Sequence, residues 1–229
     1  MQGKNRFFIF FHFVIAISAA ALCLQTKLFY SNFDYPLTLI AFVFFATLLS
    51  YNLHFSFAAR KSSSSEQLLW FREMKNLVLI LNIISLIGTL WFWWKIRSIH
   101  IHIVAAILFN AAYTAPLLLK NPIQLPSLLT FIKSYYIGFV WAYATVVLPL
   151  AFLTIEPTIN ETFLFISRLL LVALATMIFD YRDRLRDFEM GVHTPANRMN
   201  ERQFEIFFFF NVVLYSFSCL LYTSDAADE

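Results

Sequence analysis

Charged residues are scarce in this chain of 229 residues: Asp, Glu, Lys and Arg make up 14% of it, whereas 60% of the residues are hydrophobic. A soluble domain carries about 25% charged and about 45–50% apolar residues. Because so few charges cannot cover a water-facing surface, the composition excludes a soluble enzyme. The net charge of only +3, scattered between apolar runs, also argues against nucleic-acid binding. The composition therefore predicts an integral membrane protein.

Glycine and cysteine are also rare. Four glycines cannot build a glycine-rich nucleotide-binding loop, and two cysteines, Cys23 and Cys219, exclude a disulfide framework or a four-cysteine metal site. Phenylalanine, in contrast, occurs 28 times. This content is typical of lipid-facing surfaces and of contacts between helices in a membrane.

The apolar residues occur in long, unbroken runs. A helix needs about 20 apolar residues to cross the hydrocarbon core, whereas the strands of a membrane barrel are short and alternating. Seven runs approach the helical length, and they predict an all-α bundle of seven membrane spans in a single domain. We expect the spans at residues 7–24, 36–57, 76–94, 101–119, 134–153, 163–180 and 205–218.

The basic residues between these runs predict the orientation of the chain. With a cytosolic N-terminus, thirteen Lys and Arg residues lie in cytosolic segments, and only Lys27, Lys95 and Arg97 lie outside. We therefore expect a multi-pass protein of a bacterial inner membrane with its N-terminus in the cytosol. The two longest connections, 58–75 and 181–202, then both face the cytosol.

The last eleven residues, CLLYTSDAADE, resemble the translation of a sequencing adapter. This likeness predicts that residues 219–229 are not native and that the native part of the chain is the single domain 1–218. A natural polar C-terminus is the alternative.

Three aspartates, Asp180, Asp183 and Asp187, lie within eight residues at the end of the sixth expected span. On one continuous helix, steps of three and four residues would place them on one face. Clustered carboxylates at a membrane interface suit Mg²⁺, and a carboxylate that ends an apolar span is costly unless it is functional. The alternative is a solvated helix end with the ion pairs Asp180–Arg184 and Asp183–Arg186.

The spacing of these aspartates, with Gly191 and Thr194 after them, resembles the second aspartate motif of the UbiA-type membrane prenyltransferases. Tyr113 followed by Lys120 resembles the end of that family's fourth helix, and the segment that begins at Lys133 is similar to its fifth. The resemblance implies a bundle of nine membrane helices, of which this chain holds seven. It also implies a Mg²⁺ site at the three aspartates and makes Tyr113, Lys120 and Lys133 candidates for substrate binding.

The chain departs from the family at the first aspartate motif, which the resemblance places at the end of the second span. Asn52 is kept there, but Leu53, Ser56 and Arg60 occupy the positions of the three aspartates. Asn52 remains a candidate for substrate binding. Arg60 is a candidate to contact a diphosphate directly, as Arg does in other proteins, and its alternative role is to anchor the helix at the interface.

The resemblance implies a Mg²⁺-dependent transferase that moves a prenyl chain from a prenyl diphosphate to an aromatic or quinone-precursor acceptor in the bilayer. We expect no nucleic acid among its partners, and no catalytic residue stands out. The alternative is a non-catalytic protein that binds a polyprenyl lipid or has a structural role. A transporter or receptor is disfavoured, because only Arg168 is charged well inside a span and the seventh run has no lysine.

Overall fold

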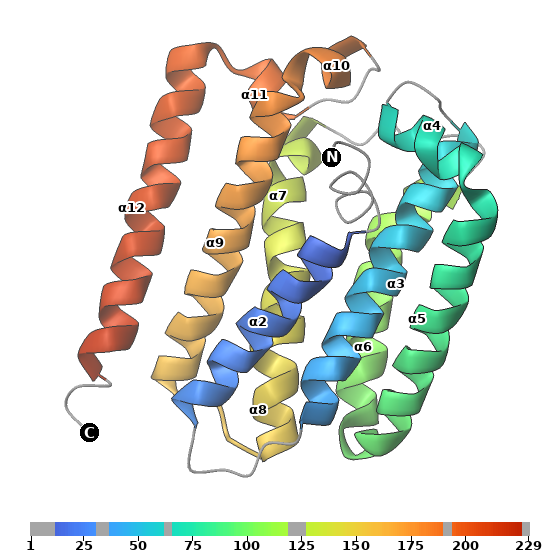
Figure 1. Ribbon diagram of the computed structural model, residues 1–229. Coiled ribbons are helices and arrows are strands. Elements are labelled where there is room, and N and C mark those ends of the chain that lie inside the picture. The colour runs from blue at the N-terminus through green and yellow to red at the C-terminus, as the bar shows by residue number, and fades with distance from the viewer. Residues whose placement is uncertain (1–11, 31–36, 62–65, 119–126, 190–193, 226–229) are drawn as a thin grey trace, which may run out of the picture. The chain divides into compact units, whose positions relative to one another are not determined.

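The computed structural model describes residues 12–30, 37–61, 66–118, 127–189 and 194–225 (Figure 1). Every regular element in these residues is a helix. Five of the helices are long and apolar enough to cross a membrane. The chain divides into two units, residues 1–122 with 148–154 and residues 123–147 with 155–229.

Helices occupy the described part of each expected span, which confirms the all-α membrane bundle. Their bounds are α2 (Phe13–Phe29), α3 (Leu37–Lys61), α5 (Lys75–Lys95), α6 (His100–Leu118), α7 (Ser127–Ala142) with η2 (Tyr143–Val147) and α8 (Leu148–Leu153), α9 (Ile159–Arg182) and α12 (Glu201–Asp225). Residues 7–11 of the first expected span lie outside the described residues. The expected boundary of the native chain, after Ser218, falls within α12 and stays a prediction.

Three short helices occupy the two long connections, where the sequence pattern predicted no span. They are α4 (Glu66–Glu73), α10 (Arg184–Glu189) and α11 (Pro195–Arg198). A fourth short element, η1 (Arg97–Ile99), joins α5 to α6. None of the four approaches the roughly 20 residues that a membrane span requires.

In the first unit α3 packs against α5 and α2, and α4 packs against the end of α3 (Figure 1). Ala59, Phe71 and Val78 form a buried cluster that joins α3, α4 and α5. α5 exposes Ile80 and Ile83 as well. An exposed apolar stripe of this kind is expected where a helix faces lipid.

In the second unit α9 packs against α7 and against α12 (Figure 1). Glycine allows the close approach of α7 and α9, because a Cβ on Gly138 would lie 2.3 Å from the carbonyl oxygen of Leu169. Met177 and Phe204 are the buried contacts between α9 and α12. α9 begins at a capping box, in which the backbone N–H of Thr158 donates to Glu161 at 2.7 Å.

Candidate functional site

Asp180 lies in the last turn of α9 and is 7% exposed. Lys133, on α7, places its Nζ 3.0 Å from Oδ1 of Asp180. Ser134, the next residue of α7, donates a hydrogen bond of 3.4 Å to Oδ2. α7 therefore supplies both a positive charge and a hydroxyl donor to a carboxylate at the end of an apolar helix.

Asp183 directly follows the last residue of α9 and is paired with its own neighbour. Nε and Nη2 of Arg182 donate to the two carboxylate oxygens of Asp183 at 3.0 Å and 2.8 Å. Arg182 is 65% exposed, so this fork-shaped pair lies at the surface. Its guanidinium also stands 5.1 Å from the centre of the Phe179 ring.

The three aspartates do not share one continuous helix. α9 ends at Arg182, Asp183 is not helical, and α10 begins at Arg184. Asp187 lies on α10 and is 8% exposed, and its backbone N–H donates to the carbonyl of Asp183 at 3.0 Å. The expectation of one uninterrupted helix is therefore wrong, because the helix is interrupted at Asp183.

One ion pair of the sequence-based alternative, Asp180–Arg184, is not formed, and the side chain of Arg186 lies outside the described part of the chain. Asp180 takes Lys133 as its partner in place of Arg184, and Arg182 binds Asp183. Arg184 instead stacks on Tyr181, with its guanidinium carbon 4.0 Å from the ring centre. Nothing in the spacing of the motif indicates Lys133, because it lies 47 residues away on another helix.

Two of the three aspartates have cationic partners, since Lys133 pairs with Asp180 and Arg182 pairs with Asp183. The Mg²⁺ site that the resemblance implies at Asp180, Asp183 and Asp187 stays a prediction. In the described part of the chain, no group of three or more His, Cys, Asp or Glu side chains is placed to hold a metal ion. This end of α9 therefore carries cationic side chains beside its aspartates, and cationic side chains can contact an anion directly.

The candidates of the first unit lie around α3. Asn52 is fully buried, and its Oδ1 lies 3.2 Å from Nδ1 of His12, the residue that precedes α2. Tyr113, on α6, stacks on His54 with ring centroids 5.2 Å apart. Both candidates thus join α3 to a neighbouring helix. Lys120 lies outside the described residues.

Arg60 is exposed at the end of α3 and lines a cavity with Leu53 and Ser56, the two other residues at expected aspartate positions. Arg72 and Lys75 line the same cavity. In the sequence, Arg72 and Lys75 stand out only as two of the thirteen basic residues of the cytosolic segments. Their spacing around a short helix in a long connection could have indicated a basic cluster.

Comparisons with known proteins establish the fold. No family model and no curated protein matches the chain. A solved structure does, described as "Structural and mechanistic insights into the biosynthesis of Digeranylgeranylglyceryl phosphate synthase in membranes". The two chains are 19% identical with a TM-score of 0.60, over 95% of this chain and 76% of that one.

The chain shares the fold of that synthase. This likeness confirms the expected fold class, an all-α bundle of membrane helices. Together with the five apolar helices, it makes the chain a multi-pass membrane protein.

Proposed function

We propose that this protein transfers a prenyl chain from a prenyl diphosphate to a lipophilic acceptor within the bilayer, an aromatic ring or a quinone precursor. The observation that carries the proposal is the fold match over 95% of the chain. The cationic side chains at the end of α9 support it, because a diphosphate needs positive partners wherever it binds.

In the proposed reaction the bond between C1 of the prenyl chain and the diphosphate oxygen breaks, and the diphosphate leaves with the electron pair. The acceptor forms a new bond to C1 and loses a proton. Lys133 would bind the departing diphosphate through its ammonium group, since 30% of its side chain is exposed while it contacts Asp180. Arg182 and Arg184 lie at the same end of α9 and would add further positive charge.

The second candidate is a non-catalytic protein that binds a polyprenyl lipid. Two observations favour it: Leu53, Ser56 and Arg60 stand where the resemblance implies aspartates, and Lys133 and Arg182 already pair two of the remaining carboxylates. The transferase stays our first proposal, because direct contacts from cations can also neutralise a leaving diphosphate. The test below is carried out with Mg²⁺ and with a chelator, and no step of the proposed reaction is assigned to the metal.

The test measures binding and turnover on the same sample. The full chain in nanodiscs receives geranylgeranyl diphosphate as donor probe and a membrane lipid extract as acceptor, with Mg²⁺ or with a chelator. We expect release of diphosphate and a prenylated product. Donor binding without product would overturn the transferase in favour of the binding protein, and absence of both would overturn both candidates.

A residue-level comparison accompanies this assay. Lys133→Gln removes the cation from Asp180 and should weaken donor binding at least tenfold, about 1.4 kcal/mol. Glu156→Gln, an exposed position just before the other end of α9, is the matched control and should bind normally. A melting curve for each variant separates lost binding from lost folding. Normal donor binding by folded Lys133→Gln would remove Lys133 from the proposed site.

A further inference from the structure

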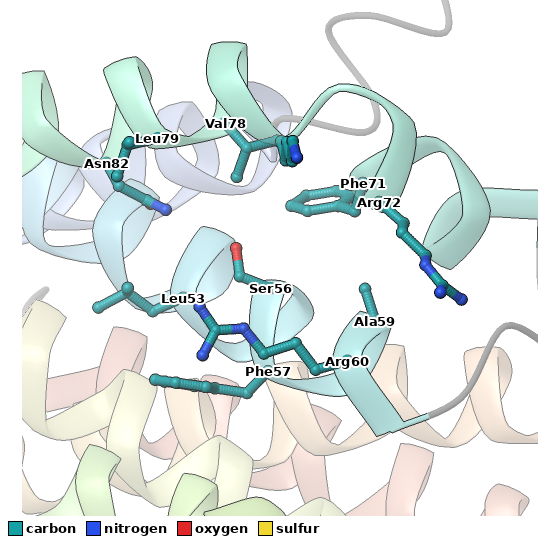
Figure 2. A pocket seen from close by; sticks show the side chains of 11 residues that line it. Leu53, Ser56, Phe57, Ala59, Arg60, Phe71, Arg72, Val78, Leu79 and Asn82 are labelled. Atoms are coloured by element: carbon teal, nitrogen blue, oxygen red, sulfur yellow. The ribbon is translucent and has the colours of Figure 1, made fainter.

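A cavity of about 510 Å³ opens between the end of α3, the short helix α4 and the start of α5 (Figure 2). Its apolar wall includes Leu53 and Phe57 of α3, Phe71 of α4, and Leu79 of α5. In Figure 2 the Phe71 ring points from α4 toward the space between the helices. All of these residues belong to the first unit.

The charged residues of this cavity all have the same sign. Arg60, Arg72 and Lys75 line it, all three side chains are exposed, and no carboxylate occurs among the described residues of its wall. Arg60 turns back along α3, and its guanidinium carbon lies 5.7 Å from the centre of the Phe57 ring (Figure 2). The cavity therefore suits an anion, and it offers that anion no metal-binding group.

Charge and apolar surface are separated along the helices. Arg60 lies at the end of α3 and Lys75 at the start of α5, whereas Leu53 and Leu79 lie one to two turns further into their helices. Next to Leu79, the side chains of Ile80 and Ile83 face outward from α5. A ligand that fits this order has an anionic head at the helix ends and a hydrocarbon chain along the helices.

An anionic phospholipid has this order of groups. Basic pockets between membrane helices bind anionic head groups, and the cytoplasmic leaflet is rich in such lipids. The excess of Lys and Arg predicts that this end of α3 and α5 is cytosolic. The apolar outer face of α5 beside the cavity gives a lipid access from the bilayer.

We propose that the cavity between α3, α4 and α5 binds an anionic phospholipid of the surrounding leaflet. Its phosphate lies at the helix ends among the positive charges of Arg60, Arg72 and Lys75, and one acyl chain lies against Leu53 and Leu79. The site goes beyond prenyl transfer and does not depend on it, since its ligand is a bilayer component that undergoes no reaction.

The experiment compares lipids on the full chain in detergent micelles. Phosphatidylglycerol and phosphatidylcholine are titrated in turn, and bound lipid is counted by native mass spectrometry while a melting curve is recorded. We expect one tightly retained phosphatidylglycerol and a higher melting temperature, with neither effect from phosphatidylcholine. Equal retention of the two lipids would overturn the proposal.

A pair of double variants locates the site. Arg72→Gln with Lys75→Gln removes two cations from the cavity and should weaken phosphatidylglycerol binding at least tenfold. Lys95→Gln with Arg97→Gln removes two exposed cations at the opposite end of α5 and just after it, and should leave phosphatidylglycerol binding unchanged. If both double variants lost the same amount of phosphatidylglycerol binding, the effect would follow from net charge alone. That result would overturn the proposed site.

Two further probes identify the source of the anion. Inorganic phosphate should not displace phosphatidylglycerol, because it has no chain to lie against Leu53 and Leu79. Geranylgeranyl diphosphate should not displace it either. Displacement by the prenyl diphosphate would make the cavity a donor site and would overturn the lipid assignment. Binding of phosphatidylglycerol with no prenyl transfer would leave this inference standing and count only against the proposed function.

Discussion

At the scale of single residues, the ion pair between Lys133 and Asp180 is an important contact between two helices of the second unit. Asp180 sits where an apolar helix ends, with 9% of its side chain exposed, and a lone carboxylate there would be costly. Lys133 and Ser134 remove that cost by supplying a positive charge and a hydroxyl donor. The pair thereby ties α7 to the end of α9.

Loss of Lys133 should therefore destabilise the protein more than loss of both partners. Lys133→Met leaves the Asp180 carboxylate without its cation, at a cost of roughly 1–3 kcal/mol for an unpaired buried group. Adding Asp180→Asn should recover part of this loss, because the amide carries no charge. Thermal unfolding in detergent, followed by tryptophan fluorescence, measures the difference. Simple addition of the two losses would contradict a pairwise contact.

The ion pair of Asp183 lies at the surface and can be compared with the less exposed pair of Asp180. The partner of Asp183, Arg182, is 65% exposed, so solvent screens their attraction. Asp183→Asn should cost less than about 1 kcal/mol, and the same unfolding assay measures it. A loss as large as that of Lys133→Met would mean that Asp183 has a structural role beyond this pair.

At the scale of elements, the packing of α7 on α9 depends on one glycine. Gly138 is buried, and its missing side chain lets α7 approach the backbone of Leu169. A backbone carbonyl cannot rotate away from an added methyl group as a flexible side chain can. The contact between α7 and α9 therefore tolerates little added side-chain volume at Gly138.

Gly138→Ala should lower the melting temperature, because overpacking of a tight contact costs about 1–3 kcal/mol. Gly88→Ala is a graded comparison on α5, where the new Cβ would lie 2.7 Å from the ring of Phe45. That ring is a side chain and can shift, so the loss should be smaller. Melting curves of both variants under the same conditions show which substitution lowers the melting temperature more. A larger loss for Gly88→Ala would contradict this account of the helix contacts.

At the scale of the whole molecule, the orientation in the membrane follows from the basic residues and can be tested at exposed positions. Cys23 and Cys219 are first replaced by alanine, and single cysteines are then placed at Glu73, Ser98, Glu156 or Arg182, all of which are exposed. A membrane-impermeant maleimide on intact cells should label Ser98→Cys and Glu156→Cys. It should label Glu73→Cys and Arg182→Cys only after the membrane is opened, because the positive-inside rule places them in the cytosol.

The opposite labelling pattern would reverse the orientation. It would place the aspartates of α9 and α10 on the outer side, together with the basic cavity of the first unit. The proposal of a cytosolic-leaflet phospholipid would then lose its topological support.

The sequence was sufficient to predict the long helices because a membrane span is defined by the length of an apolar run, which is a local property. It did not predict α4, α10 and α11, which are too short and too polar to stand out from a connection. It also did not predict the interruption at Asp183, because the spacing of the aspartates suits a continuous helix as well as a broken one.

The sequence by itself determined that this is a helical membrane protein, and its second aspartate motif resembles that of the UbiA-type membrane prenyltransferases. Only the tertiary structure decided which charges meet. Lys133 reaches Asp180 because α7 packs against α9, and Arg60, Arg72 and Lys75 share one cavity because α4 folds back on α3 and α5. The hydrophobicity of a segment depends on its own residues and can therefore be determined from the sequence. Ion pairs and cavities depend on which helices pack together, and that is a property of the folded molecule.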